Sequence, residues 1–71
     1  MKFIKDIMKR EQEFVQRFGR QPNVIIVGKI VYRDLLTEVY LHGLDSLKSL
    51  FGADIELDEE IAVDAVRLIR R

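Results

Sequence analysis

Four consecutive β-branched residues, "VIIV" at positions 24–27, constrain the fold of this chain more than any other feature. β-Branched side chains favour strands, because in a helix they crowd the preceding turn. The run does not alternate with polar residues, as it would in a strand with one face in water. We therefore expect a central strand that is covered on both faces, with Pro22 before it and Gly28 after it.

The residues before this strand have the spacing of an amphipathic helix. Apolar residues recur every three or four positions from Phe3 to Phe18, and opposite charges on the other face are four residues apart. Gly19 is suited to a left-handed helix end, and Pro22 cannot continue a helix. A helix is predicted over residues 3–18.

A second helical region is predicted over residues 30–51. We favour a break at Gly43, followed by a short helix with Asp45 as N-cap and Gly52 as terminator, over a continuous helix. Apolar residues fill about half of the helical wheel, while Arg33, Asp34, Thr37 and Glu38 fill the rest. The apolar half consists of Val31, Tyr32, Leu35, Leu36, Val39 and Tyr40. So wide a stripe indicates contact with more than one surface.

The C-terminal part contains one clear strand and one ambiguous stretch. "DIELD" at 54–58 alternates apolar and acidic residues, which predicts a half-buried strand. In "EEIAVDAVRLIRR" acidic residues come first and arginines last, which suits a helix and its dipole. "AVRLI" suits a strand equally well, with Val66 and Leu68 joining Ile55 and Leu57 on one face.

Composition excludes several classes of protein. The 71 residues make one domain, with twelve basic and twelve acidic residues, one histidine and no cysteine. The balanced charge gives no overall attraction to nucleic acid or to a membrane surface, and the absence of cysteine and the single histidine argue against a metal site. No apolar run approaches the ~20 residues needed to span a bilayer. We expect a cytoplasmic protein without a cofactor.

Three candidate sites have ordinary explanations. "GK" at 28–29 follows a strand as in a phosphate-binding loop, but Asn23 and Ile30 stand where that motif needs glycine and a hydroxyl. We therefore predict a plain turn, with backbone freedom supplied by Gly28. His42 is interpreted as a helix-terminal residue rather than a general base, and "DEE" at 58–60 as a solvated turn. No enzymatic activity is expected.

Glu11 is the least ordinary residue, because it falls at the centre of the first helix's apolar stripe. A carboxylate there is costly to bury unless it is paired or protonated. Glu11 would therefore reach an arginine or tyrosine, lie where the helix extends past the core, or meet a basic residue of another subunit.

Two stretches within residues 22–69, "PNVIIVGKIVYRDLL" and "LFGADIELDEEIAVDAVRLI", share a recognisable pattern. With this pattern the region resembles a unit of tailed-phage major capsid proteins and encapsulins, and small prophage-encoded proteins that carry it. The resemblance implies a strand, a helix, a second strand and an acidic turn, then a closing strand at 65–69 that forms a hairpin around 58–64. The chain is far shorter than a capsid subunit and lacks the family's other domains, so a shell-forming role is not expected.

These observations predict an α+β fold over residues 1–71, with an N-terminal amphipathic helix in segment 1–20 and a β-α-β-β unit in segment 22–71. The unit would form a small three-stranded mixed sheet with helices packed on it. Strands one and two would be parallel across a right-handed crossover, and strands two and three would form the hairpin.

The predicted function is that of a small structural or interaction protein, phage- or prophage-derived, that self-associates as a dimer. A regulatory module that binds another phage or host protein is the alternative. Three short strands and a few helices give little core for so apolar a chain, so a monomer would leave an apolar patch. The candidate interface residues are Phe3, Ile7, Glu11, Phe14, Phe18, Tyr32, Tyr40 and Ile69.

Overall fold

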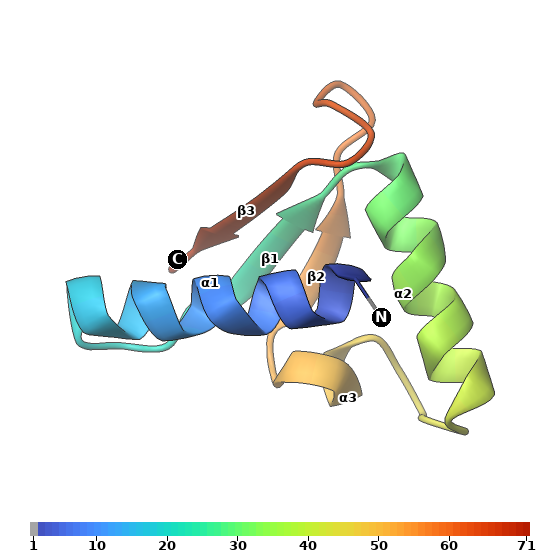
Figure 1. The fold of residues 1–71 in the computed structure, drawn as a ribbon, viewed down its shortest axis with the longest axis horizontal. Helices are drawn as coiled ribbons and strands as arrows, with labels where there is room; N and C mark the ends of the chain where they lie inside the picture. Colours follow the sequence, from blue (N-terminus) through green and yellow to red (C-terminus); the bar gives the residue numbers. More distant parts are fainter. Residues whose placement is uncertain (1) are drawn as a thin grey trace.

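Helices lie against one face of a three-stranded mixed sheet in the computed structural model, which describes residues 2–71 (Figure 1). The predicted α+β fold is confirmed, and every predicted strand is present. The elements in chain order are α1 (Lys2–Phe18), β1 (Val24–Val27), α2 (Lys29–Leu41), α3 (Lys48–Phe51), β2 (Asp54–Leu57) and β3 (Val66–Ile69). None of the helices within residues 2–71 is long and apolar enough to cross a bilayer.

The strand order is β2-β1-β3, so β1 is the central strand, as "VIIV" predicts. β1 pairs with β2 in parallel, which is also confirmed. The predicted hairpin between β2 and β3 is wrong, because β3 lies on the other side of β1 and pairs with it antiparallel. Ile25 is therefore flanked by Ile55 on one side and Leu68 on the other. Both edges of β1 are hydrogen-bonded, whereas a β2–β3 hairpin would leave one of them unpaired.

Gly28 makes this topology possible, because the loop 58–65 passes over the end of β1 in contact with it. A Cβ at Gly28 would lie 2.1 Å from the carbonyl oxygen of Ala62 and 2.6 Å from that of Val63. The backbone of Gly28 is ordinary and extended, at φ −77° and ψ 172°. The prediction that Gly28 supplies backbone freedom is therefore wrong, since the glycine is needed for close approach.

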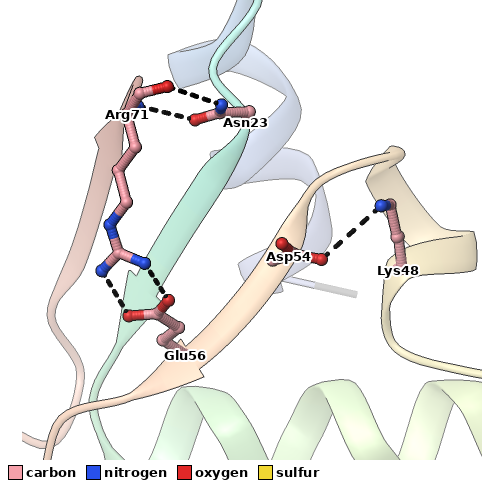
Figure 2. A network of polar contacts seen from close by, with 5 residues as sticks. All are labelled: Asn23, Lys48, Asp54, Glu56 and Arg71. Carbon is pink, nitrogen blue, oxygen red and sulfur yellow. Dashed lines mark hydrogen bonds and ion pairs between the residues drawn. The ribbon is translucent and has the colours of Figure 1, made fainter.

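The core lies on one face of the sheet. Ile25 and Val27 point to this face, where Ile7 of α1 and the buried side of α2 cover them. The fully or nearly fully buried core residues are Ile7, Ile25, Val27, Val31, Leu35, Ala53 and Val66. Val24 and Ile26 point to the other face, which no helix of the described chain covers; α1 crosses only the core face in Figures 1 and 2. Val24 is nevertheless only 4% exposed and Ile26 is half-buried, so β1 is largely buried on both faces, as expected, although no helix of residues 2–71 covers the second one.

α2 is rotated from the orientation that its sequence predicts. It buries Val31, Leu35 and Glu38, the last with only 6% of its surface exposed. Leu36 and Tyr40, which belong to the predicted apolar stripe, are exposed, and Tyr40 is 85% exposed. The buried carboxylate of Glu38 has a partner, because its Oε2 lies 3.0 Å from Nε2 of His42. His42 is the C-cap of α2, which confirms its interpretation as a helix-terminal residue.

The predicted helix ends agree with the structure except at one cap. α1 ends at Phe18, and Gly19 has φ 69° and donates its N–H to the carbonyl of Val15 at 2.7 Å. The break after α2 is present at Gly43, and Gly52 ends α3. The prediction of Asp45 as N-cap of the short helix is wrong, since α3 starts later and its N-cap is Leu47.

Candidate functional site

α1 is longer than the sheet that it covers. Near its start Ile7 is fully buried, and Phe3 and Ile4 pack against the core. The same apolar stripe continues to Phe14, which is half-buried, and to Phe18, which is 57% exposed. In Figure 1 the last turns of α1 extend beyond β3 and the chain's C-terminal end. The distal half of α1 therefore carries an apolar stripe that the sheet leaves partly uncovered.

A groove of about 910 Å³ lies between this half of α1 and the end of β3. We call it the α1–β3 groove. Its aromatic wall is a pair of rings, Phe14 and Phe18, whose centroids are 4.7 Å apart with a 50° tilt. The complete lining is Arg10, Glu13, Phe14, Arg17, Phe18, Arg20, Leu68, Ile69, Arg70 and Arg71. The first six come from α1 and the turn after it, and the last four come from β3 and the residues that follow it.

The strand side of the groove is held by the segment that connects α1 to β1. Asn23 Nδ2 donates to the carbonyl of Arg71 at 3.2 Å, and the N–H of Arg71 donates to Asn23 Oδ1 at 2.9 Å (Figure 2). Arg70 Nη1 donates to the carbonyl of Gln21 at 2.9 Å. These contacts fix the backbone of the last residues, so the groove has two defined walls.

The α1–β3 groove is rich in positive charge, with five arginines and only Glu13 in opposition. Arg10 is paired with Asp6 at 3.0 Å, and Arg71 with Glu56. Among the described residues, Arg17 and Arg20 have no carboxylate within ion-pair distance. The guanidinium of Arg17 lies over the ring of Phe18, 5.4 Å from its centroid. The surface therefore combines unpaired cations with an aromatic wall.

The open face of the sheet carries an ion pair that spans the central strand. The guanidinium of Arg71 binds both carboxylate oxygens of Glu56, from the far side of β1 (Figure 2). The hydrogen bond from Arg71 lowers the pKa of Glu56 below its ordinary value. Lys48 Nζ lies 3.6 Å from Asp54 Oδ1 on the same strand as Glu56. The pair with Glu56 compensates Arg71 within the chain. Arg17, Arg20 and Arg70 are the arginines of the groove that have no carboxylate partner among the described residues.

The predicted interface residues separate into three groups. Phe14 and Phe18 of α1 line the α1–β3 groove together with Ile69, which is distant in sequence. Phe3 and Tyr32 pack against the core, and Ile7 is completely buried and offers no surface to a partner. Tyr40 is on the outer side of α2, away from the groove, and Glu11 lies on another side of α1.

Glu11 lines a smaller hollow of about 450 Å³ on α1. Of the alternatives predicted for Glu11, an ion pair or hydrogen bond within the chain is not present among the described side chains. Burial raises the pKa of its carboxyl above the ordinary value. The half-buried position fits the alternative in which α1 has begun to extend past the core. The other lining residues are Met8, Gln12, Val15, Gln16 and Gln21.

None of the five arginines of the groove is among the predicted interface residues. Arg10 is four residues before Phe14 and Arg17 is three residues after it, so all three lie on the same side of α1. This helical spacing could have predicted Arg10 and Arg17 as neighbours of Phe14. Arg20, Arg70 and Arg71 come from two other segments, and only the pairing of β3 with β1 brings them to the same place.

The first amides of α2, which follow the Gly28-Lys29 turn, are bonded to the backbone of the same chain. The N–H groups of Ile30 and Val31 donate to the carbonyl of Val63 at 2.9 and 3.4 Å. In a phosphate-binding loop such amides point at the phosphate. Lys29 is exposed. No group of three or more potential metal ligands was found among residues 2–71.

Comparison with known proteins gives no match: no family model, no curated protein and no solved structure is significantly similar to this chain. Function is therefore inferred from the residues and their arrangement.

Proposed function

We propose that this protein is a small structural or interaction protein that self-associates, in the simplest case as a two-fold dimer. The observation that carries the proposal is the distal half of α1, where Phe14 and Phe18 extend the apolar stripe past the sheet that covers its first half. Exposed aromatic side chains beside arginines are the usual composition of a binding surface. A phage or prophage origin, which the resemblance implies, belongs to the same proposal.

Sedimentation equilibrium of two matched variants tests this function. Phe18→Asp and Met8→Asp each place a carboxylate on α1, at residues that are 57% and 53% exposed, but only Phe18 lines the groove. We expect Phe18→Asp to abolish association and Met8→Asp to preserve it. Equal association of both variants would contradict the proposal.

A regulatory module that binds another protein is the second candidate, and the outer side of α2 favours it. Leu36, Tyr40 and Leu41 are exposed there, on a surface separate from the α1–β3 groove. In this alternative the substitution Tyr40→Asp would weaken capture of a partner while leaving the mass of the protein in solution unchanged.

A further inference from the structure

We propose that β3 pairs antiparallel with β3 of a second copy, so that the two sheets become continuous and the acidic loop of each copy enters the α1–β3 groove of the other. The acidic loop is residues 58–64. This inference rests on the proposed self-association and names the surface that performs it.

The outer edge of β3 is available for such pairing. β3 is an edge strand, and Gly28 donates to the carbonyl of Ala65, so residues 65, 67 and 69 direct their backbone groups toward β1. Residues 66 and 68 therefore direct theirs outward. Arg10 Nη1 reaches the carbonyl of Val66 from that side, at a long 3.4 Å. Among residues 2–71, no backbone group bonds to the outward-facing backbone groups of residues 66 and 68. An edge strand with unpaired backbone groups can accept an added strand.

The two ends of β3 carry opposite charge, which selects the antiparallel arrangement. Before β3, the acidic loop contains no basic residue and presents the partly exposed apolar side chain of Val63. Its acidic residues are Asp58, Glu59, Glu60 and Asp64. After β3 lies the groove with Arg17 and Arg20. Antiparallel pairing sets the start of one strand beside the end of the other, so both contacts join opposite charges. Parallel pairing would bring like charges together.

The sequence of β3 also selects a register. Pairing centred on Arg67 would place the two Arg67 side chains directly opposite each other on the open face, which is unfavourable for like charges. Pairing centred on Leu68 places Arg67 opposite Ile69 of the second copy. Ala65 then lies opposite Arg71 of the second copy, so that Asp64, the residue before Ala65, is near that arginine. Leu68 shares a row with Ile25 and Ile55 on the core face. That row would then continue across both copies.

α1 would complete the contact. Its distal half lies on the core side of the sheet and extends beyond β3 (Figure 1), so it would lie over the first residues of the second copy's β3. Phe14 and Phe18 would then cover Val63 of that copy, and Arg17 would face Asp64. Each chain therefore offers both halves of the contact.

Amide hydrogen exchange at low and high protein concentration tests the strand pairing. We expect the N–H groups of Val66 and Leu68 to become protected as concentration rises. Those of Arg67 and Ile69 face β1 and serve as the internal control, because they should be protected throughout. A dimer in which Val66 and Leu68 exchange as freely as in the monomer would overturn the strand pairing while leaving self-association intact. A chain that stays monomeric would contradict the proposed function itself.

A charge swap tests the contact between loop and groove. Arg17→Glu and Asp64→Arg should each weaken self-association, by roughly threefold to tenfold in Kd, since each creates two like-charge contacts per dimer. A mixture of the two variants should associate as tightly as the unmodified chain, because a mixed dimer has one swapped pair and one native pair. A mixture no tighter than either variant alone would overturn the loop–groove contact.

Nucleic acid is the competing occupant of a groove with arginines and aromatic rings. A short single-stranded DNA provides the probe. We expect it to leave the dimer intact, because Glu13 and the acidic loop of the second copy would oppose phosphate. Saturable resonance shifts at Arg17 and Phe18 together with dissociation of the dimer would overturn the proposal.

Discussion

At the scale of single residues, Gly28 is the one of the four glycines at which an added Cβ would meet other atoms. A Cβ there would overlap the carbonyl oxygen of Ala62, and the loop 58–65 would have to move. We predict that Gly28→Ala lowers the free energy of unfolding by about 1–3 kcal/mol. It should also shift the amide resonance of Ile30, which bonds to Val63.

Gly43→Ala is the control for the resonance shift, since a Cβ at Gly43 meets no atom within 4 Å. The φ of 63° makes this substitution strained as well, so it also lowers stability, but without contact with the loop 58–65. Gly43→Ala should leave the Ile30 resonance in place. Urea denaturation and amide spectra measure both effects. A Gly28→Ala protein as stable as the unmodified chain would show that the loop does not pass against this residue.

Glu11 gives a prediction about pH. Burial raises the pKa of its carboxyl, so the folded state binds this proton more tightly than the unfolded state does. The contribution to stability is complete below the ordinary value of 4.5 and is lost as pH rises through the raised value. Glu11→Gln should therefore be more stable than the unmodified protein at neutral pH, with the difference disappearing in acid.

Denaturant titrations of both proteins across this pH range measure the difference. Glu56 acts in the opposite direction, because its pKa is lowered and its contribution is lost as pH falls below 4.5, but it is common to both proteins and cancels in the comparison. If Glu11→Gln were the less stable protein at neutral pH, the carboxylate would have a favourable partner, such as a basic residue of a second copy.

At the scale of elements, the parallel pairing of β1 with β2 was predicted, but the partner of β3 was not. β-Branching and alternation are local, and they located β1 and β2 within a residue of their observed ends. For β3 the local pattern suited a helix equally well, and the resemblance favoured the strand. The pairing of β3 depends on whether the loop before it can cross β1, which is decided by the contact of Gly28 with Ala62 and Val63. Such a contact joins distant residues and leaves no local pattern.

The orientation of α2 was unpredictable for a related reason. Apolar residues fill about half of the circumference of this helix, so its own sequence does not decide which part of that half is buried. Contacts with the sheet do, and they bury Glu38 and expose Tyr40. The α1–β3 groove was half predictable, because its aromatic residues follow the periodicity of α1 while its arginines come from three segments.

Two substitutions in α2 test this orientation. Leu35→Ala removes a completely buried side chain and should cost about 2–5 kcal/mol of stability. Tyr40→Ala should change stability by less than about 0.5 kcal/mol, as surface substitutions usually do. Thermal or urea denaturation gives both values. Equal losses of stability in the two variants would mean that Tyr40 is buried as Leu35 is, and would contradict the orientation of α2 described above.

At the scale of the whole molecule, the chain is neutral but its charges are separated along β3. Acidic residues gather before the strand and arginines after it, so association should depend on charge attraction between exposed groups. We predict that added salt weakens the dimer, because exposed charges are screened within about 10 Å at 0.1 M ionic strength. Sedimentation equilibrium at two salt concentrations measures this. Association that tightens with salt would indicate an interface dominated by apolar contact.

Self-association is the central claim, and the mass of the unmodified chain in solution tests it most directly. Light scattering on a dilution series should give twice the 8.3 kDa mass of one chain at high concentration and approach 8.3 kDa on dilution. A mass of 8.3 kDa at every concentration through the micromolar range would contradict it, and would mean that Phe14 and Phe18 remain exposed in an isolated monomer.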